Sequence, residues 1–599
     1  MDGPSPLAAD NAIRALHAGI LEGVPGFAER LPDAERLGVK ALFERLAGRP
    51  ERLQALQHAF YRDWLELWST ILRDGDLDLG VRADPETDSR FAAPEWRTLP
   101  FFRFLRASYE LNARWLRNLV ALADLPAPTE QRLSFAIQQL IDALAPTNFP
   151  IGNPEVIRLA FESAGASLRT GLANLQSDIA RGAITMSEPG AYEVGRNLAV
   201  TPGAVVHEND IAQLIQYAPR TEKVRAQPLL IVPPFINKFY ILDLQPHNSF
   251  VRHALAQGFQ VFMVSWRNPT EPQTRSTWAD YVVKGVHEVI RVVLDISAAR
   301  RIHVLGFCVG GTLLASALAV LPKREPIASL TLLATLLDFQ DVGPIGHYID
   351  ETYVRQCEQE YAQGGLVSSA QIAASFASLR ANELVWFFVV NNYLKGRHPK
   401  PFDLLQWNSD STNAPGPLFA WYLRNMYLEN RLIQRNALEL LGQRIDLTRL
   451  DMPAYILATE QDHIVPWKSA YASARCLSGP IEFVLGASGH VAGIVNPPCA
   501  NRRHYWLNPA VDFGTCAPDA WLTTATRVPG SWWTHWAAWM SSRSGPWKRS
   551  AKRLGSKNHP IIEPAPGRYV RAVASDWLAR AVESERPKKT PAMEPGLNL

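Results

Sequence analysis

One short segment combines the residue types and the spacing of a covalent catalyst. The apolar residues 302–305 lead into Gly-Phe-Cys-Val-Gly at 306–310, and the residues after this motif favour a helix. A strand, a sharp turn and a helix around Gly-x-Cys-x-Gly form a nucleophile elbow, with cysteine in the place that serine usually takes. The two glycines matter sterically, because side chains at those positions would collide with the neighbouring strand and helix. We therefore predict that Cys308 is a nucleophile with an exposed sulfur, and not a buried structural thiol.

A thiol nucleophile needs a base and an acid, which in this type of site follow it in the order acid, then histidine, each just past a strand end. His490, preceded by glycines, is the predicted base that draws the proton from Cys308. His463 is the rival base, but it directly follows Asp462, so its side chain should point away if Asp462 faces the site. Asp462 is the predicted acid, with Glu460 as an alternative and a helix-capping role for Asp462 still open.

Two backbone N–H groups are candidates for stabilising the negative oxygen that develops when a carbonyl is attacked. The elbow aims the N–H of Val309 toward that oxygen. The second donor is expected in the loop 233–238, where lipases have a glycine-rich oxyanion loop. That loop lacks glycines in this chain, and we expect the N–H of Ile236 to contribute.

Cysteine in the nucleophile position favours acyl transfer over hydrolysis. A thiolate that takes an acyl group from a thioester forms another thioester, so the step is nearly isoenergetic and the acyl group stays activated. Passing the group to an alcohol then gives the more stable oxygen ester. This chemistry fits transfer from coenzyme A to a hydroxyl group, and it requires that water be kept away from the intermediate.

The rest of the chain predicts the sheet that positions these side chains. From about residue 200, apolar runs alternate with helical patterns, which is typical of a parallel sheet covered by helices on both faces. The predicted strands are residues 204–208, 211–217, 229–232, 260–266, 302–305, 330–334, 454–458 and 481–485. Together with the elbow, this pattern predicts an α/β-hydrolase fold with a doubly wound, mostly parallel sheet.

A long interruption of this alternation predicts a cap. The residues between 334 and 454 contain helical periodicity but no strand alternation, and a loop of that length is improbable in a compact domain. We predict an inserted helical cap at residues 340–435, lying over the carboxyl ends of the strands, where open sheets form their active sites.

The remaining segments complete the predicted organisation. Residues 1–190 predict a helical N-terminal domain for docking, oligomerisation or surface attachment, and residues 191–545 the catalytic domain. Residues 546–599 are basic and rich in proline, and roughly the last 15 are expected to be disordered. Within the N-terminal domain, Asn153 followed by proline predicts the start of a helix that continues through Leu168.

The composition argues against several classes of function. The chain has 599 residues, a net charge of +3 and 47% hydrophobic residues, which gives no signal for nucleic-acid binding. Its five cysteines show no paired spacing, so neither a disulfide scaffold nor a metal site is expected. We also expect no secretory signal and no transmembrane segment, because the N-terminus lacks the required regions and no apolar run is long enough.

Five long motifs occur in order along the chain. In the order of the argument they are Gly-Phe-Cys-Val-Gly-Gly-Thr at 306–312, Pro-Pro-Phe-Ile-Asn-Lys-Phe-Tyr-Ile-Leu-Asp-Leu at 233–244, Val-Ser-Trp-Arg-Asn-Pro at 264–269, Phe-Asp-Leu-Leu-Gln-Trp-Asn at 402–408 and Ser-Gly-His-Val-Ala-Gly at 488–493. Together they resemble the class I polyhydroxyalkanoate synthases, and the resemblance runs from residue 95 or so to about 580.

The resemblance implies a specific reaction. It implies polymerisation of (R)-3-hydroxyacyl-CoA, with 3-hydroxybutyryl-CoA as the expected short-chain unit, through a thioester on Cys308 and with release of CoA. It implies His490 as the base and Asp462 as the acid, and in that family the aspartate is often credited with activating the incoming hydroxyl. Whether Asp462 orients His490 or activates that hydroxyl stays open.

The resemblance also implies partners and location. No cofactor is expected beyond the coenzyme A that belongs to the substrate, and no obligate second subunit. Family members dimerise and work at the surface of polyester granules in the cytoplasm, with the N-terminal helical domain expected to support both. The tentative substrate-pocket residues are Asn237, Asp243, Trp407, Asn408 and His463, for which a purely structural role stays open.

Two other functions compete with this interpretation. One is a hydrolase of the same fold, such as a thioesterase, a lipase or a polyester depolymerase, against which the cysteine, the absent glycine-rich loop and the long cap argue. The other is a non-catalytic protein of the granule surface, against which the complete set of nucleophile, acid and base argues.

Overall fold

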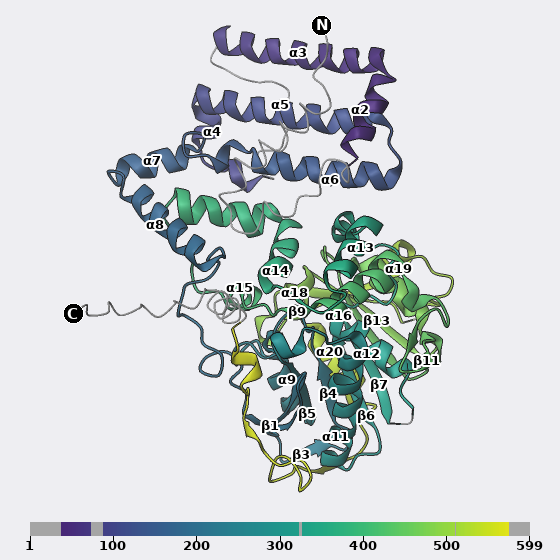
Figure 1. Ribbon diagram of the computed structural model, residues 1–599. Coiled ribbons are helices and arrows are strands. Elements are labelled where there is room, and N and C mark those ends of the chain that lie inside the picture. Colours follow the sequence, from purple (N-terminus) through teal and green to yellow (C-terminus); the bar gives the residue numbers. More distant parts are fainter. Residues whose placement is uncertain (1–37, 74–87, 323–325, 510, 574–599) are drawn as a thin grey trace, which may run out of the picture.

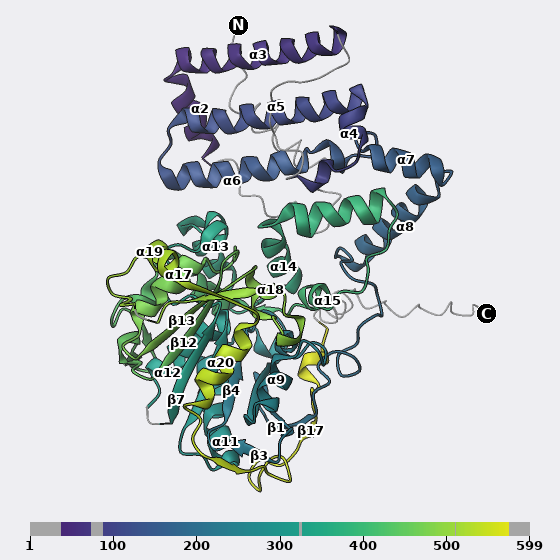
Figure 2. The ribbon, with the colours of Figure 1, turned by 180° about the vertical axis from the view of Figure 1, so that it is seen from behind.

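The computed structural model describes residues 38–73, 88–322, 326–509 and 511–573. A stack of helices from the N-terminal part lies on one side of a larger α/β domain, as the two opposite views show (Figures 1 and 2). The catalytic elements belong to the α/β domain, and the cap lies between it and the helical stack.

The α/β domain is built on one mixed sheet, which has eleven strands within the described ranges. In spatial order the strands are β15 (Thr526–Pro529), β14 (His504–Leu507), β13 (Ile481–Gly486), β12 (Ala454–Thr459), β7 (Ile327–Leu333), β6 (Ile302–Phe307), β4 (Leu229–Val232), β5 (Val261–Trp266), β2 (Ala212–Tyr217), β1 (Gly203–Glu208) and β17 (Glu563–Pro564). The six strands from β13 to β5 run parallel, in a register that pairs Ile456 with Phe483 and Leu230 with Val304. Strands β4, β5, β6 and β7 are buried along their whole length, which explains their continuous apolar sequences.

The predicted α/β-hydrolase fold is confirmed, and every predicted strand is present within a few residues of its predicted bounds. The sequence pattern does not predict the antiparallel edge strands β14, β15 and β17. These strands are short and partly exposed, so they show neither an apolar run nor a strict alternation.

Helices cover both faces of the sheet and form two separate cores. One face carries α10 (Trp278–Val282), η6 (Val283–His287), α11 (Glu288–Ser297), α12 (Val309–Ala319), α17 (Trp467–Ser473) and α19 (Pro518–Thr524), and the other carries α9 (Phe250–Ala256) and α20 (Trp532–Ser541). Helix α20, which the sequence pattern does not predict, buries Trp532, Trp533 and Trp536 against the sheet. The two cores fix the sheet rigidly beneath the loops that carry the site.

The chain between β7 and β12 forms a helical cap, as predicted. Its elements are η7 (Gly343–Tyr348), α13 (Glu351–Glu360), β8 (Leu366–Val367), α14 (Ser369–Ser378), η8 (Asn382–Trp386), η9 (Val389–Leu394), α15 (Asp403–Ser409), β9 (Ala414–Pro415), α16 (Gly416–Tyr422), η10 (Leu423–Leu428) and η11 (Arg431–Ile433). Strands β8 and β9 pair with each other, and a small hairpin of β10 (Glu439–Leu440) and β11 (Gln443–Arg444) leads back to the sheet.

The N-terminal part consists of α2 (Val39–Ala47), α3 (Pro50–Arg73), α4 (Glu95–Thr98), α5 (Pro100–Ala123), α6 (Ala127–Ala143), α7 (Pro154–Glu162) and α8 (Ala166–Arg181). Asn153 caps α7, and its side chain accepts from the N–H groups of Glu155 and Val156. The prediction that this helix continues through Leu168 is wrong. The helix ends at Glu162, and Gly165, with φ of 80°, turns the chain into α8.

The N-terminal helices are docked on the cap. Phe135 of α6 packs edge-on against Tyr348 of η7, with ring centroids 5.5 Å apart. Further along, Asn174 of α8 donates to the backbone carbonyl of Asn392 in η9 at 3.0 Å. Gly171 of α8 lies so close to η9 that an added Cβ would fall 1.8 Å from a backbone oxygen.

The C-terminal part returns to the α/β domain. β16 (Trp547–Arg549) pairs with β3 (Lys223–Arg225), and β17 closes the sheet beside β1. The expected disorder of the final residues lies outside the described residues, which end at 573.

Among the described helices, no single one is long and apolar enough to cross a membrane. The pair Ser369–Ser378 and Asn382–Leu394 meets the length and composition criteria only together, across a bend of 115°.

Candidate active site

The predicted nucleophile occupies a strained turn between β6 and α12. Cys308 has φ of 52° and ψ of −130°, a conformation that non-glycine residues rarely adopt, and it directly precedes the helix. A Cβ on Gly306 would lie 2.3 Å from the Cα of Gly311, and a Cβ on Gly310 would lie 2.4 Å from the carbonyl oxygen of Pro233. The steric reason for the two glycines of the motif is therefore confirmed.

The predicted base and acid meet beside the elbow. His490 stands at the start of α18 (His490–Ile494), just past β13, and Asp462 lies in the loop after β12. The Nδ1 atom of His490 lies 2.7 Å from Oδ2 of Asp462. With Nδ1 used in this way, Nε2 is the ring atom left for the hydrogen bond that His490 shares with Cys308. The ring of Phe307 stacks on that of His490, with centroids 5.5 Å apart, and limits its rotation.

Every acceptor position of the buried Asp462 carboxylate is in use. Its Oδ1 atom accepts from the N–H groups of Ile464 at 2.9 Å and Val465 at 2.8 Å. Its Oδ2 atom faces His490 and also accepts from Thr459 Oγ1 at 3.0 Å. The carboxylate is thus held in one orientation, toward the imidazole.

The electrostatics of this pair favour its ionised form. Burial alone would lower the pKa of His490, but the Asp462 carboxylate and the neighbouring Cys308 raise it to about 10. Burial would likewise raise the pKa of Asp462, yet His490 and the backbone N–H groups hold it below its usual value. The imidazole therefore binds a proton tightly, which suits a group that takes one from a thiol.

The two alternatives considered from sequence lie outside this arrangement. His463 is half-buried, and burial together with the charge of Arg380 lowers its pKa to about 4, so it is neutral at physiological pH. Glu460 is exposed to solvent at the end of the strand. Neither residue is among those that line the cavity around Cys308.

Val309 and Ile236 are the residues predicted to supply the N–H groups of an oxyanion hole. Val309 is the first residue of α12, so its N–H belongs to the unpaired donors of that helix N-terminus. Ile236 lies in the loop that follows β4, and its N–H donates to no described residue. Both residues line the same cavity as Cys308.

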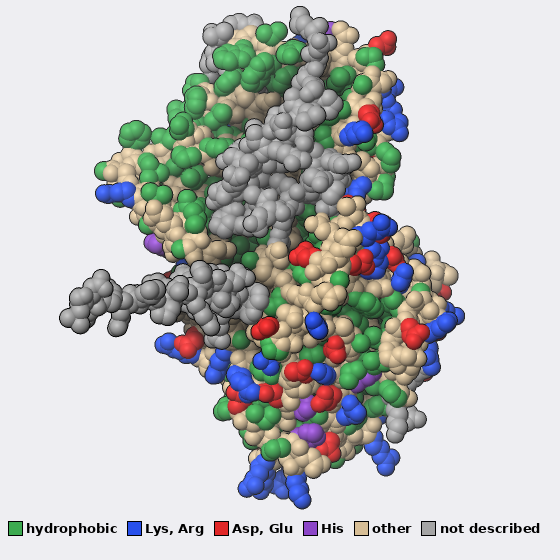
Figure 3. Space-filling model, viewed as in Figure 1, with side chains coloured by type: hydrophobic (Ala, Val, Ile, Leu, Met, Phe, Trp, Pro, Cys, Tyr) green, Lys and Arg blue, Asp and Glu red, His purple; other side chains and the backbone are tan. Residues whose placement is uncertain are grey.

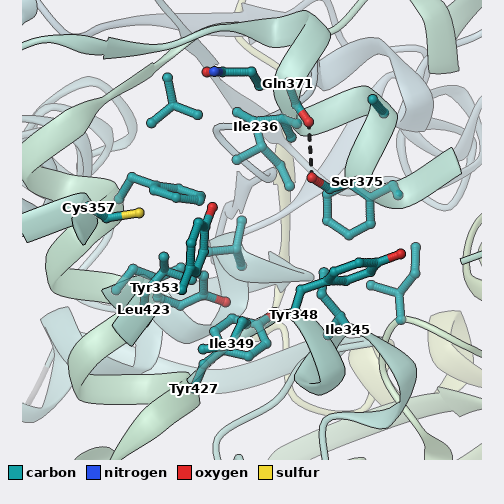
Figure 4. Close-up of a pocket in the computed structure, with 18 of the residues that line it drawn as sticks. Ile236, Ile345, Tyr348, Ile349, Tyr353, Cys357, Gln371, Ser375, Leu423 and Tyr427 are labelled. Carbon is teal, nitrogen blue, oxygen red and sulfur yellow. Dashed lines mark hydrogen bonds between the residues drawn. The ribbon is translucent and has the colours of Figure 1, made fainter. Parts of the chain in front are cut away.

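A cavity of about 370 Å³ connects Cys308 with the inside of the cap. Figure 4 shows cap side chains converging on it, with Tyr348 from η7, Tyr353 and Cys357 from α13, and Leu423 and Tyr427 from η10. Ile236 lies on the opposite side of the same space, below α14. The lining is mostly apolar and aromatic, which suits an acyl chain and a dry reaction site.

The tentative pocket residues lie outside this cavity. None of Asn237, Asp243, Trp407, Asn408 and His463 lines it. Instead, Asp243 is buried and accepts from the hydroxyls of Thr201 and Ser249, both at 2.5 Å. Trp407 is also buried, and it binds a backbone carbonyl of the loop after β4. Asp243 and Trp407 thus take part in the packing of the loop after β4 and not in lining the cavity.

Several residues that line the cavity were not predicted from the sequence. Tyr422 and Tyr427 of the cap lie close enough to Cys308 for charge on the thiol to help raise the pKa of both phenols, after burial as the main cause. Gln139 of α6 also lines the cavity, and its Nε2 donates to the backbone carbonyl of Ser378 at 3.0 Å. An amphipathic helix pattern gives no sign of which distant residues it will meet, so the sequence holds no signal for Gln139.

Within the described residues, no group of three or more His, Cys, Asp or Glu side chains is arranged to hold a metal ion.

The fold and the site define an α/β-hydrolase in which cysteine takes the nucleophile position, and a family model of the alpha/beta hydrolase fold matches residues 227–497. A second model, the N-terminus of poly-beta-hydroxybutyrate polymerase (PhaC), matches residues 87–254. Over 532 residues, the chain is 47% identical to the poly(3-hydroxyalkanoate) polymerase subunit PhaC of Cupriavidus necator, covering 88% of this chain and 89% of that protein. It is 38% identical over 567 residues to the protein of that name from Rhizobium meliloti, covering 92% and 91%.

The chain therefore belongs to the poly(3-hydroxyalkanoate) polymerase family, and the resemblance read from its motifs is confirmed. It is an enzyme, and its reaction is the polymerisation of hydroxyalkanoate units. Among solved structures it is similar to a hydrolase from Pseudomonas aeruginosa, at 17% identity and a TM-score of 0.30, covering 49% of this chain and 92% of that one.

Proposed function

We propose that this enzyme polymerises (R)-3-hydroxyacyl-CoA, with short-chain units such as 3-hydroxybutyryl-CoA, through a covalent thioester on Cys308. Coenzyme A arrives with the substrate and leaves as product, and no further cofactor or metal takes part. The observation that carries the proposal is the arrangement around one cavity. Cys308, Val309 and Ile236 line it, and the His490–Asp462 pair stands beside the thiol.

In the first half-reaction, Nε2 of His490 takes the proton of Cys308, and the sulfur attacks the thioester carbonyl carbon. The N–H groups of Val309 and Ile236 stabilise the oxyanion that forms. When this intermediate collapses, the bond between the carbonyl carbon and the CoA sulfur breaks. His490 gives its proton to the departing CoA thiolate, and the acyl group remains on Cys308.

In the second half-reaction, a hydroxyl of another 3-hydroxyacyl unit attacks the Cys308 thioester. The hydroxyl proton passes to His490, the carbon–sulfur bond to Cys308 breaks, and an oxygen ester forms. His490 then returns the proton to the cysteine. Since both oxygens of Asp462 are occupied by other donors, the contacts support an orienting role of this carboxylate toward His490 over direct activation of the hydroxyl.

The walls around the nucleophile support a short acyl unit. Tyr422 and Tyr427 are half-buried, line the cavity and lie near the sulfur, where they leave limited room for a long side chain. The apolar lining also supports exclusion of water, which would otherwise hydrolyse the thioester in competition with each incoming hydroxyl.

Incubation of the enzyme with (R)-3-hydroxybutyryl-CoA tests the proposal and its main alternative, a thioesterase or other hydrolase of the same fold. We expect turbid polymer, stoichiometric CoA release and a mass shift of one acyl unit on the peptide containing Cys308. Release of free 3-hydroxybutyrate without polymer would identify a hydrolase. Polymer formed without any acyl group on Cys308 would contradict the thioester intermediate.

The proposal also covers partners and location. We propose that the enzyme works as a homodimer at the surface of cytoplasmic polyester granules and needs no second kind of subunit. Support comes from the apolar side chains that α7, α8 and the turn before α7 expose. Ile151, Phe161, Leu172 and Ile179 are 79%, 83%, 56% and 56% exposed. Figure 3 shows hydrophobic side chains gathered over the helical part and charged side chains over the α/β domain. An apolar polymer surface would cover such side chains favourably.

A further inference from the structure

The loop that carries Ile236 is held from above by one short piece of the cap. This loop follows β4 and spans residues 233–242. The piece of the cap, here called the anchor segment, comprises residues 407–413, which run from the end of α15 to the residue before β9. Asn237 of the loop and Ser411 of the anchor segment form an antiparallel bridge.

Two hydrogen bonds from Thr412 fix the peptide groups around Ile236. The hydroxyl of Thr412 donates to the carbonyl oxygen of Phe235 at 2.7 Å, and the N–H of Thr412 donates to the carbonyl oxygen of Ile236 at 3.3 Å. Thr412 is 2% exposed, so water does not compete for these carbonyls.

The bond to Phe235 determines where the N–H of Ile236 points. The carbonyl of Phe235 and the N–H of Ile236 belong to one planar trans peptide, in which the two bonds point in opposite directions. A donor that holds the carbonyl on the cap side therefore turns the N–H to the other side. Ile236 itself lines the cavity that contains Cys308 and Val309.

The neighbouring residues of the anchor segment keep Thr412 in register with the loop. The buried ammonium of Lys238 lies 2.5 Å from Oδ1 of Asp410, and the hydroxyl of Tyr240 donates to Oδ2 of the same carboxylate at 2.8 Å. The indole N–H of Trp407 donates to the carbonyl of Lys238 at 2.7 Å. These groups explain why the family motif around Trp407 packs against the loop and not into the cavity.

The same segment is bound to the rest of the cap. The side chain of Asn413 accepts from the N–H of Ser369, at the start of α14, at 2.9 Å. The next residue, Ala414, belongs to β9, which pairs with β8. A shift of the cap away from the sheet would therefore pull directly on the donor that fixes the Phe235 carbonyl.

We propose that Thr412 is a positioning residue that aims the N–H of Ile236 at the developing oxyanion, so that the oxyanion hole is complete only while the cap segment 407–413 is seated on the loop. The inference rests on the proposed Cys308 chemistry and names the cap residue that prepares the site for it. Without the Thr412 hydroxyl, the peptide between Phe235 and Ile236 is free to rotate, and one of the two oxyanion donors is lost for part of the time.

The test compares Thr412→Val, which removes the hydroxyl at nearly constant size, with Thr412→Ser, which keeps it. For 3-hydroxybutyryl-CoA we expect kcat of Thr412→Val to fall about tenfold to a hundredfold, with KM changed less than about twofold, because only transition-state stabilisation is affected. Thr412→Ser should keep kcat within about threefold of wild type on the same argument.

A transition-state mimic separates this role from a general loss of packing. A trifluoromethyl ketone analogue of the CoA substrate forms a tetrahedral adduct with a thiolate, and its oxygen occupies the oxyanion position. Its affinity should fall in Thr412→Val by the same factor as kcat, whereas the affinity for free CoA should not change. The matched control is Ser544→Ala, which removes an equally buried hydroxyl that donates to the carbonyl of Met540 at 2.7 Å, outside the cavity lining. It should leave both measurements at the wild-type value.

Three results would overturn the inference: kcat of Thr412→Val within twofold of wild type, a fall in kcat without a fall in affinity for the analogue, or a Ser variant as slow as the Val variant. Thermal unfolding is recorded for each protein, and Thr412→Ala takes the place of Thr412→Val if the latter does not fold. Failure of the proposed function is a separate result, since wild type itself would then form no Cys308 thioester.

Discussion

At the scale of single residues, the strained cysteine is the feature on which the proposed chemistry depends most. Its left-handed backbone and the two glycines beside it are stereochemical requirements of the elbow, and they hold for any nucleophile. The choice of sulfur is a chemical requirement, because a thioester keeps the acyl group activated between additions.

We therefore expect Cys308→Ala to abolish polymer synthesis and CoA release while the protein remains folded. Cys308→Ser should be nearly as inactive, because the hydroxyl has a far higher pKa and would form a stable oxygen ester. CoA release measured with a thiol reagent and circular dichroism spectra of the three proteins check both statements. Residual turnover above a few per cent of wild type in the alanine variant would rule out Cys308 as the nucleophile.

The two neighbouring histidines should respond very differently to the same substitution. His490 bonds to Asp462 and Cys308, whereas His463 is neutral and lies outside the cavity. His490→Gln should therefore lose acylation of Cys308 by a factor of about 10³ or more, and His463→Gln should keep a substantial part of it. Rapid-quench trapping of labelled acyl-enzyme measures this step directly, and the reverse ranking would show that the base is misassigned.

The same pair predicts a pH dependence of stability. Folding raises the pKa of His490 to about 10, above the value near 6.5 of an unfolded histidine, so the native state binds this proton more tightly. The stabilisation is complete below about pH 6.5 and is lost as the pH rises toward 10. The difference in free energy of unfolding between wild type and His490→Gln should therefore shrink between these two pH values.

His463→Gln is the matched control for this measurement. The pKa of His463 is lowered to about 4, so this residue does not change charge between pH 6.5 and 10. Urea unfolding at several pH values should give a constant difference for the control. A constant difference for His490→Gln as well would contradict the raised pKa.

At the scale of elements, the residues of the proposed catalytic site could be singled out from sequence because each one lies in a short local motif. Cys308 and Asp462 follow strands that are buried along their whole length, and His490 follows a strand whose last four residues are buried. Continuous apolar runs identify such strands easily. The edge strands β14, β15 and β17 could not be found, since half-exposed strands of two to four residues carry no clear period.

The cavity walls could not be predicted, and the reason is again physical. Tyr427 and Gln139 are brought to Cys308 by packing between segments more than a hundred residues apart, and no local pattern encodes that. The polar run from Asp410 to Asn413 is a signal that does exist. The role of this polar run becomes clear only from the structure, in which Thr412 and Asp410 bind the loop after β4.

The cap should open and close as one element, since its side chains line the cavity around Cys308 and the site must admit CoA and release a chain. The stretch 358–369 joins α13 to α14 and contains Gly364 and Gly365 in backbone conformations that other residues rarely adopt, with exposed residues at Gln359 and Gln363. Limited proteolysis should cut first within this stretch when no substrate is present, and more slowly once Cys308 is acylated. Equal cutting in both states, or cutting only outside residues 340–430, would argue against a moving cap.

At the scale of the whole molecule, the N-terminal helices take part in the site as well as in the surface. Helix α6 supplies Gln139 to the cavity wall, and its Phe135 packs on the cap residue Tyr348. The side-chain oxygen of Gln139 has no donor among the described residues, although the residue is only 8% exposed. The helical part thus contacts the cap, and the cap contacts the loop after β4 through residues 407–413.

The exposed apolar side chains of α7 and α8 should bind the product surface. Phe161, Leu168 and Leu172 are 83%, 41% and 56% exposed, which is costly in water and favourable against an aliphatic polyester. We expect the double variant Phe161→Asp, Leu172→Asp to lower binding to purified poly(3-hydroxybutyrate) particles by roughly tenfold or more, with soluble turnover of 3-hydroxybutyryl-CoA nearly unchanged. Ala173→Asp, which adds a charge to an exposed position of α8 without removing a large apolar side chain, should bind like wild type. Sedimentation of the three proteins with the particles measures this, and equal binding of all three would place the attachment surface elsewhere on the molecule.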